Sequence, residues 1–120
     1  MTYRVGLPAP KVLRMHDSHL IYKVCPAAEW HAAAAAGVYR GSAVDLQDGF
    51  IHFSTSGQLA ETVRRHFAGQ SDLVLVEVDP DDLGVHLRWE SSRGGDLFPH
   101  LHGELPVSLA RRVSPLDVEG

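Results

Sequence analysis

The order of helical and strand-like patterns along the chain constrains its fold more than any other feature. Two helix-favouring segments, residues 26–37 and 55–69, come early, whereas strand-like patterns dominate from residue 72 onward. Strand and helix do not alternate throughout, as they would in a parallel α/β sheet. This order predicts an α+β fold in which two helices pack on a mostly antiparallel sheet.

Both predicted helices carry local signals. The alanine-rich segment 27–36 favours a helix, and Gly37 supplies its stop. Its buried stripe is predicted at Trp30, Ala33 and Ala34. The second helix begins with the capping-box spacing of Thr55 and Gln58. On one of its faces an apolar residue recurs at every fourth position, at Leu59, Val63 and Phe67.

Apolar patterns predict the strands. Residues 73–76 are continuously apolar, which favours a central strand, and residues 85–90 alternate between apolar and polar. Pro99 and Pro106 predict edges or bends, because proline cannot donate a hydrogen bond within a sheet. Further strands are predicted at residues 19–26 and 50–54 and once or twice within 97–113, and a loop with at most a short strand at 38–49.

Size, charge and cysteine content exclude several classes of protein. A chain of 120 residues forms one domain, predicted at residues 19–115 between tails at 1–18 and 116–120. With a net charge of −4 and no basic block, it is not expected to bind duplex nucleic acid, although RNA stays open. No apolar run is long enough for a membrane span. The single Cys25 fits a cytoplasmic protein, and a monomer is expected because no large apolar face is evident.

The chain holds eight histidines, and one of them stands inside the strand-like run GFIHFST. Residues two apart on a strand share a face and lie about 6–7 Å from each other. His52 and Ser54 are therefore predicted to point the same way, with Ile51 and Phe53 toward the core. A histidine that only bonds a neighbouring carbonyl is the alternative.

A second candidate region spans residues 88–103, where imidazole, guanidinium and carboxylate groups recur beside two aromatic residues. This composition suits a pocket for a polar, anionic or sugar-bearing small molecule. A solvated hairpin loop would explain its glycines equally well. The candidate residues in this region are Arg88, Glu90, Arg93, Asp96, His100 and His102.

Two other kinds of chemistry use residues of these types. His100 and His102 form a usable metal-binding pair, and His52 would be a third ligand. That pattern is short, and nothing in the sequence places His52 beside it, so no metal is assigned. A nucleophilic pair of Ser54 and His52 is not supported, because no nucleophile elbow is present.

Several motifs occur in the order found in a small bacterial family, the domain of unknown function 952: IYKV, EW, DGFIHFST, WE and GGDLFPHLHG. The chain resembles this family over about residues 20–113. The family has been grouped with the ADP-ribosyltransferase-like superfamily. The resemblance therefore implies a split antiparallel sheet with a cleft for NAD.

The resemblance also implies roles for the candidate residues. His52 and Ser54 would bond ribose hydroxyls, Arg88 or Arg93 would meet phosphate, and Glu90 would stabilise a cationic sugar. The candidate catalytic residues are His52, Glu90 and His100, and the candidate ligand-binding residues are Ser54, Arg88, Arg93, Asp96 and His102. The implied function is binding of NAD or a related nucleotide, as substrate, with ADP-ribosyl or phosphoryl-ribose transfer. A non-catalytic binding module and a histidine-dependent metal hydrolase are the alternatives.

Overall fold

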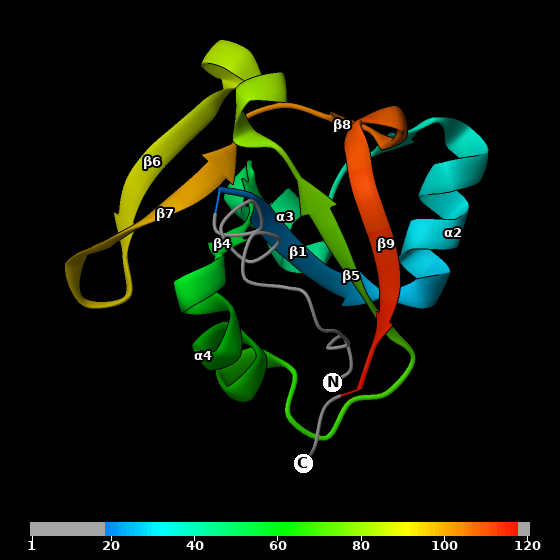
Figure 1. The fold of residues 1–120 in the computed structure, drawn as a ribbon, viewed down its shortest axis with the longest axis horizontal. Coiled ribbons are helices and arrows are strands. Elements are labelled where there is room, and N and C mark those ends of the chain that lie inside the picture. Colours follow the sequence, from blue (N-terminus) through cyan, green and yellow to red (C-terminus); the bar gives the residue numbers. More distant parts are fainter. Residues whose placement is uncertain (1–18, 118–120) are drawn as a thin grey trace, which may run out of the picture.

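The structure is a computed structural model that describes residues 19–117, so the tail predicted at residues 1–18 and the last three residues of the tail predicted at 116–120 lie outside this range. The first residue of that second tail, Leu116, is instead the last residue of a strand and pairs with Leu73. The described chain has an α+β fold with three antiparallel sheets and three α-helices (Figure 1). The predicted α+β class is confirmed, with one helix more than expected. No helix within residues 19–117 is long and apolar enough to cross a membrane.

A four-stranded sheet forms the centre of the fold. Its strand order is β4 (Ser54–Thr55), β1 (Ile21–Pro26), β5 (Leu73–Val78) and β9 (Ala110–Leu116). The central position predicted for residues 73–76 is confirmed. Alternate residues of β5 serve two separate cores, since Val74 and Val76 enter one and Leu73 and Leu75 the other. Burial on both faces explains why this strand lacks polar alternation.

The second sheet consists of β3 (Ile51–His52), β7 (Asp96–Leu101) and β6 (Leu87–Ser92), and a short pair joins β2 (Val38–Tyr39) to β8 (Leu105–Pro106). β6 and β7 form a hairpin that extends away from the other elements in Figure 1. The strand predicted at 85–90 begins later, at Leu87, because Val85 and His86 lie in a 3₁₀ turn. Such turns occur at Pro80–Asp82, Gly84–His86, Arg93–Gly95 and Val107–Leu109.

The helices are α2 (Ala27–Ala36), α3 (Ala43–Asp48) and α4 (Ser56–His66). α2 ends at Gly37, whose φ of 91° is left-handed, as its predicted stop requires. Trp30 and Ala33 are buried, but Ala34 is exposed, so the predicted stripe is wrong at that position. α3 replaces half of the predicted loop at 38–49, and β2 is the short strand that this prediction allowed. It has no apolar stripe, because Asp45 is its one buried residue.

α4 packs its predicted apolar face on the four-stranded sheet. Leu59, Val63 and Phe67 lie against a cluster of Tyr22, Val24, Leu73 and Leu75. The capping box is also present: the Gln58 N–H donates to Thr55 Oγ1 over 3.2 Å, and the Thr55 N–H donates to Gln58 Oε1 over 3.1 Å. Both local signals for this helix are therefore confirmed.

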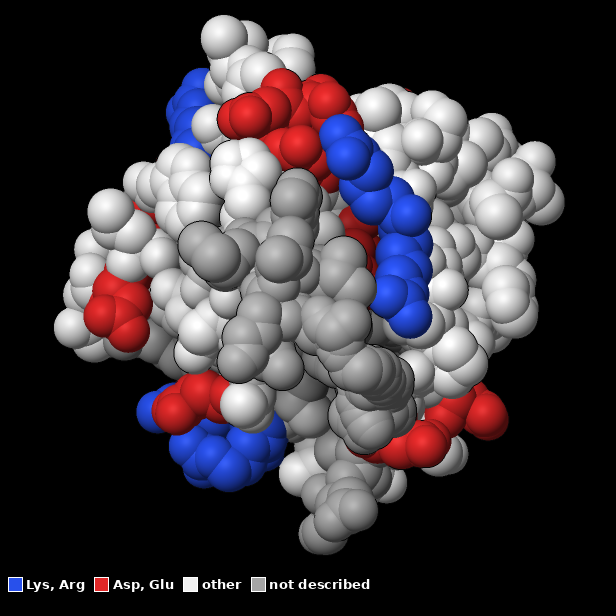
Figure 2. All heavy atoms as spheres, viewed as in Figure 1, with Lys and Arg blue, Asp and Glu red and all other residues white. Residues whose placement is uncertain are grey.

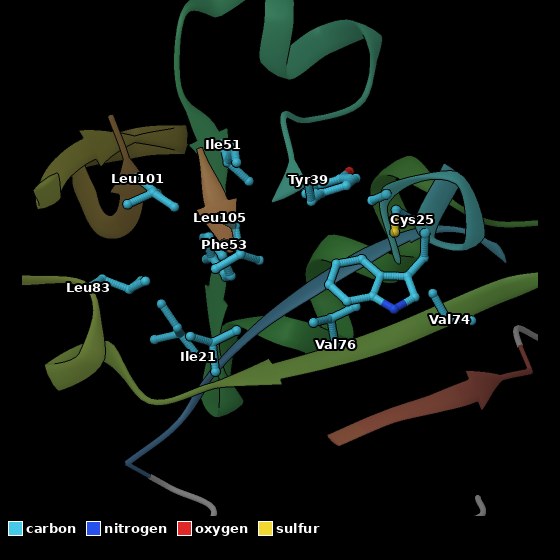
Figure 3. Packing of buried hydrophobic residues seen from close by; sticks show 13 residues of the cluster. Ile21, Cys25, Tyr39, Ile51, Phe53, Val74, Val76, Leu83, Leu101 and Leu105 are labelled. Carbon is cyan, nitrogen blue, oxygen red and sulfur yellow. The ribbon is translucent and has the colours of Figure 1, made fainter. Parts of the chain in front are cut away.

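The main core draws side chains from both larger sheets, from α2 and from the β2–β8 pair (Figure 3). The single strand predicted at residues 50–54 is interrupted at this core. β3 pairs with β7, whereas β4 pairs with β1. Phe53 lies between them, buried in the core, and its N–H donates to the Pro99 carbonyl over 3.0 Å. The chain changes sheet at Phe53, so His52 and Ser54 belong to different sheets.

Pro99 lies in β7, the middle strand of its sheet, which corrects the predicted edge or bend. The N–H and C=O of one strand residue point to the same side. The Pro99 carbonyl faces Phe53, so the position where another residue would have its N–H lies on that side as well. The paired residues of β3 end at His52, so the proline falls where this ladder has stopped. Pro106, in a two-stranded pair, does lie at an edge.

Acidic and basic side chains lie beside one another on the face shown in Figure 2. Arg111 of β9 forms ion pairs of 3.2 Å with both Asp79 and Asp82, in the turn after β5. Mixed charges of this kind differ from the continuous basic surface that non-specific nucleic-acid binding uses.

Candidate functional site

One face of the three-stranded sheet gathers the polar candidates. His52 of β3 is the Cα partner of His100 on β7, and Arg88 of β6 is the partner of His100 on the other side. Direct partners, and residues two apart on one strand, project from the same face. Glu90 therefore shares this face with the two histidines. The opposite face meets the main core through Ile51 and Leu101.

His52 is held between two carboxylates of α3. Its Nδ1 lies 2.6 Å from Asp45 Oδ1, and its Nε2 lies 3.0 Å from Asp48 Oδ2. The His52 side chain is 33% exposed, that of Asp48 is 42% exposed, and that of Asp45 is fully buried. The buried Asp45 carboxylate on Nδ1 fixes the orientation of the imidazole, and the partly exposed Asp48 carboxylate occupies Nε2. General acid–base histidines are oriented by a carboxylate on one nitrogen in the same way, but a ligand reaches Nε2 of His52 only by displacing Asp48.

Asp45 accepts hydrogen bonds on both oxygens. Oδ2 contacts Lys23 Nζ at 2.7 Å and the Ser42 backbone N–H at 2.9 Å, and Oδ1 accepts the His52 backbone N–H at 3.1 Å. Burial by itself raises the pKa of Asp45, but the hydrogen bond from His52 and the charge of Lys23 outweigh it and hold that pKa well below its usual value. Asp45 is therefore a carboxylate at neutral pH.

The local sequence Gly41-Ser42-Ala43-Val44-Asp45 builds this arrangement. Ser42 caps α3, and Asp45, three residues later, completes a capping box. Gly41 has a φ of 115°, and a Cβ placed there would lie 2.6 Å from the Asp45 Cβ. Only glycine fits that position without strain. The Ser42-x-x-Asp45 spacing is the sequence signal that could have located both α3 and this carboxylate.

The Glu90 carboxylate binds two histidines at the C-terminal end of β7, His100 in the strand and His102 directly after it. Its Oε1 lies 2.9 Å from His102 Nε2 and 2.8 Å from His100 Nδ1. Hydrogen bonds from His102 and His100 lower the pKa of Glu90. Burial lowers the pKa of His100, although Glu90 opposes this shift. His100 is therefore harder to protonate than an ordinary histidine.

Phe50 connects the two groups of histidines. Its ring stacks on His100 with centroids 4.2 Å apart and planes 25° apart, and its centroid lies 4.6 Å from that of His52 and 5.1 Å from that of His102. The His52 and His100 rings meet edge to face at 5.4 Å. We call these residues the histidine cluster: Phe50, His52, Glu90, His100 and His102. Four of them are predicted site residues, and the structure brings all four together.

The other predicted residues lie elsewhere or at the margin. Ser54 is buried, with its Oγ 2.8 Å from Thr62 Oγ1 of α4, so it does not share a face with His52. Arg88 is exposed on the cluster's face. Asp96 is exposed and lies four residues along β7 from His100, a separation of about 13 Å. Arg93 belongs to the hairpin turn, but its side chain is outside the part that the structure describes.

The three histidines do not form a ready-made metal site. Among residues 19–117, the metal-ligating atoms of His19, Asp79 and Asp81 lie within 4.8 Å of one another, and no other such group is found there. Asp79 of that group already pairs with Arg111. The cluster's histidines are each held by a carboxylate instead, which favours hydrogen bonding and proton transfer.

Comparison with known proteins places the chain in a family. The model of the family described as "Protein of unknown function (DUF952)" matches residues 24–113. The crystal structure of protein CC0527 from Caulobacter crescentus is 51% identical, covers 84% of this chain and 89% of its own, and has a TM-score of 0.82. The solution NMR structure of CC0527 gives 51% identity, coverage of 85% and 88%, and a TM-score of 0.77. No curated protein matches the chain. The chain therefore belongs to the DUF952 family of proteins of unknown function.

Proposed function

We propose that the histidine cluster binds a ribose-containing nucleotide such as NAD, with His52 as its acid–base group. The observation that carries this proposal is the pairing of a partly exposed His52 with the buried carboxylate of Asp45. An acid–base group must be held within hydrogen-bond reach of the hydroxyl that it serves. The choice of a ribose rests on the grouping of this family with the ADP-ribosyltransferase-like superfamily.

Each residue of the site has a role in this proposal. His52 hydrogen-bonds a ribose hydroxyl and exchanges a proton with it, and Arg88 meets phosphate oxygens from the same face of the sheet. Glu90 supplies the negative charge that an oxocarbenium-like state needs in glycosyl transfer. Ser54 takes no part in ribose contact, because its hydroxyl is buried against Thr62.

Isothermal titration with NAD, ADP-ribose and AMP tests the binding. The wild-type protein is expected to bind at least one of them at millimolar concentration or below. His52→Ala should weaken that binding by at least about tenfold, since about 1.4 kcal/mol of hydrogen bonding is lost. His31→Ala, on the exposed side of α2, is the matched control and should bind normally. No binding of any of the three by folded wild-type protein contradicts the proposal.

A non-catalytic binding module is the second candidate, because Glu90 is already bonded by two histidines. Incubation with NAD followed by chromatography for free nicotinamide separates the two. Transfer or hydrolysis should release nicotinamide in the wild type and at least about tenfold less in Glu90→Gln. Binding without release in the wild type favours the binding module.

A further inference from the structure

Arg88 differs from the other basic side chains that the structure describes within residues 19–117. Each of the others forms an ion pair of 3.8 Å or shorter with a carboxylate; they are Lys23, Arg40, Arg64, Arg65, Arg111 and Arg112. Arg88 is exposed and has no carboxylate partner among these residues. Glu90, two positions further along β6, binds His100 and His102 instead. The Arg88 guanidinium therefore stands beside the histidine cluster with its donors available to an anion.

Nε2 of His52 is a second hydrogen-bond donor on this face of the sheet. An ionised carboxylate only accepts hydrogen bonds. Asp45 occupies Nδ1 at 2.6 Å and Asp48 occupies Nε2 at 3.0 Å, so both ring nitrogens of His52 donate in this arrangement. The group that Nε2 holds in the free protein is thus a negatively charged oxygen.

Asp48 is the carboxylate of the two that a ligand can displace. Its side chain is 42% exposed, whereas that of Asp45 is fully buried and also binds Lys23. Asp48 is the last residue of α3, and the carbonyl end of a helix does not favour a negative charge. A partly exposed ion pair of this kind contributes little to stability. An oxyanion from solution can therefore take the place of Asp48 at a small cost.

The two donors approach the same position from neighbouring strands. His52 on β3 and Arg88 on β6 are the partners of His100 on either side of β7. Because adjacent strands lie about 4.7–4.9 Å apart, the backbones at His52 and Arg88 are separated by about 10 Å. Both side chains project from one face, so an oxyanion bound above the sheet can accept a hydrogen bond from each. The Phe50 and His100 rings adjoin His52, at 4.6 and 5.4 Å between centroids, and limit the access of competing water.

We propose that His52 Nε2 and the Arg88 guanidinium form a subsite for an oxyanion such as phosphate, and that Asp48 fills its His52 side until the oxyanion displaces it. The planar guanidinium matches the oxygens of a phosphate group. The inference rests on the proposed function in taking the histidine cluster as a ligand site, but it needs no ribose. A phosphate oxygen and the ribose hydroxyl of that proposal are alternative acceptors for the same Nε2 hydrogen.

Titration with inorganic phosphate tests the subsite. NMR of the full chain near pH 7 and at low ionic strength follows the His52 ring signals, the Arg88 Nε–H signal and the Asp48 carboxyl signal, with chloride as the reference anion. All three should shift to saturation with one midpoint, because the carboxylate leaves His52 as phosphate arrives. A linear drift that chloride reproduces overturns the subsite. An unmoved Asp48 signal, while the other two saturate, overturns the displacement.

Three substitutions identify the groups that act on phosphate. Asp48→Ala removes the competing carboxylate and should tighten binding by at least about threefold. Arg88→Ala removes a charged hydrogen-bond donor and should weaken it by at least about tenfold. Glu104→Ala is the matched control, since it also removes an exposed carboxylate, the partner of Arg40 at 2.7 Å, and should bind as the wild type does. Equal tightening in Asp48→Ala and Glu104→Ala would assign the effect to net charge and overturn the role of Asp48.

Adenosine and AMP separate this inference from the nucleotide proposal, because adenosine carries a ribose without a phosphate. Binding of adenosine without binding of inorganic phosphate overturns the oxyanion subsite and supports the ribose contact at His52. Binding of inorganic phosphate without binding of AMP or adenosine supports the subsite and contradicts the nucleotide proposal. If folded wild-type protein binds none of the three, both are overturned.

Discussion

Asp45 is the residue on which the candidate site depends most, because it binds Lys23 and His52 at once. Asp45→Asn removes the negative charge and leaves Lys23 as an unpaired, buried ammonium. We expect the free energy of unfolding to fall by about 3 kcal/mol, measured by urea denaturation near pH 7. Asp48→Asn, beside the same histidine but 42% exposed, should cost less than about 1 kcal/mol. Equal losses would show that burial of the Lys23 pair is unimportant.

His100 gives the fold a pH dependence whose sign can be stated. Burial lowers its pKa from the ordinary 6.5, so the unfolded chain takes up a proton at a higher pH than the folded chain does. Its contribution to stability is therefore complete above about pH 6.5 and is lost as the pH falls through the folded pKa. The lowered pKa values of Asp45 and Glu90 act at lower pH, since their ordinary values are 3.8 and 4.5.

The measurement is the urea midpoint at pH 7, 6 and 5. We expect the wild-type midpoint to fall over this range and the fall to be shallower in His100→Gln. His31→Gln, exposed on α2, should keep the wild-type dependence. A wild-type slope in His100→Gln would assign the effect to another group.

At this scale the sequence predicted the three histidines and Glu90, which binds two of them, but not Asp45, which binds His52, or Lys23, which binds Asp45. His52, Glu90, His100 and His102 stood out because their types and spacing suggested chemistry. Asp45 was not predicted, because a six-residue helix without an apolar stripe carries no periodic signal. Lys23 was not predicted either. Its burial depends on the carboxylate of Asp45, 22 positions later, and the alternation of residues along a strand does not reveal that contact.

At the scale of elements, local signals predicted α2, α4 and β5, because each has its own stop, cap or apolar run. The sheet change at Phe53 was not predicted, since it depends on which strands lie beside the chain on either side. Pro99 in a middle strand has the same cause. In both cases the pairing with other strands determines the position of the residue, and its own conformational preference does not.

The turn before α3 gives a prediction at this scale, with a matched pair of glycines. Gly41 and Gly49 flank α3 and both have positive φ, 115° and 89°, but only at Gly41 would a Cβ meet Asp45. Gly49→Ala should cost about 1 kcal/mol for backbone strain. Gly41→Ala should cost about 2 kcal/mol more, because the turn must move away from Asp45. Urea denaturation measures both, and similar losses would mean that the turn adapts without displacing Asp45.

At the scale of the molecule, the candidate site spans the contact between the two larger sheets. Lys23 belongs to the four-stranded sheet, His52 to the three-stranded sheet, and Asp45 of α3 links them. His100 on β7 is the partner of His52 in the sheet, and Leu101 on the opposite face of β7 packs in the main core. We therefore expect His100 to stay beside His52 only while that opposite face remains packed. Packing and site geometry are therefore coupled across the sheet.

Two leucines on the docked face of β7 test this coupling. Leu97 and Leu101 project to the same side, but Leu101 is 2% exposed in the core and Leu97, near the hairpin tip, is 55% exposed. Leu101→Ala should lower the free energy of unfolding by about 2–5 kcal/mol, because it leaves a cavity. Leu97→Ala should change it by less than about 0.5 kcal/mol. In the folded fraction of Leu101→Ala, the NMR signals of the His52 and His100 rings should also shift, whereas Leu97→Ala leaves them in place. Unshifted rings in Leu101→Ala, despite the loss of stability, would show that the histidine cluster keeps its geometry without this docking.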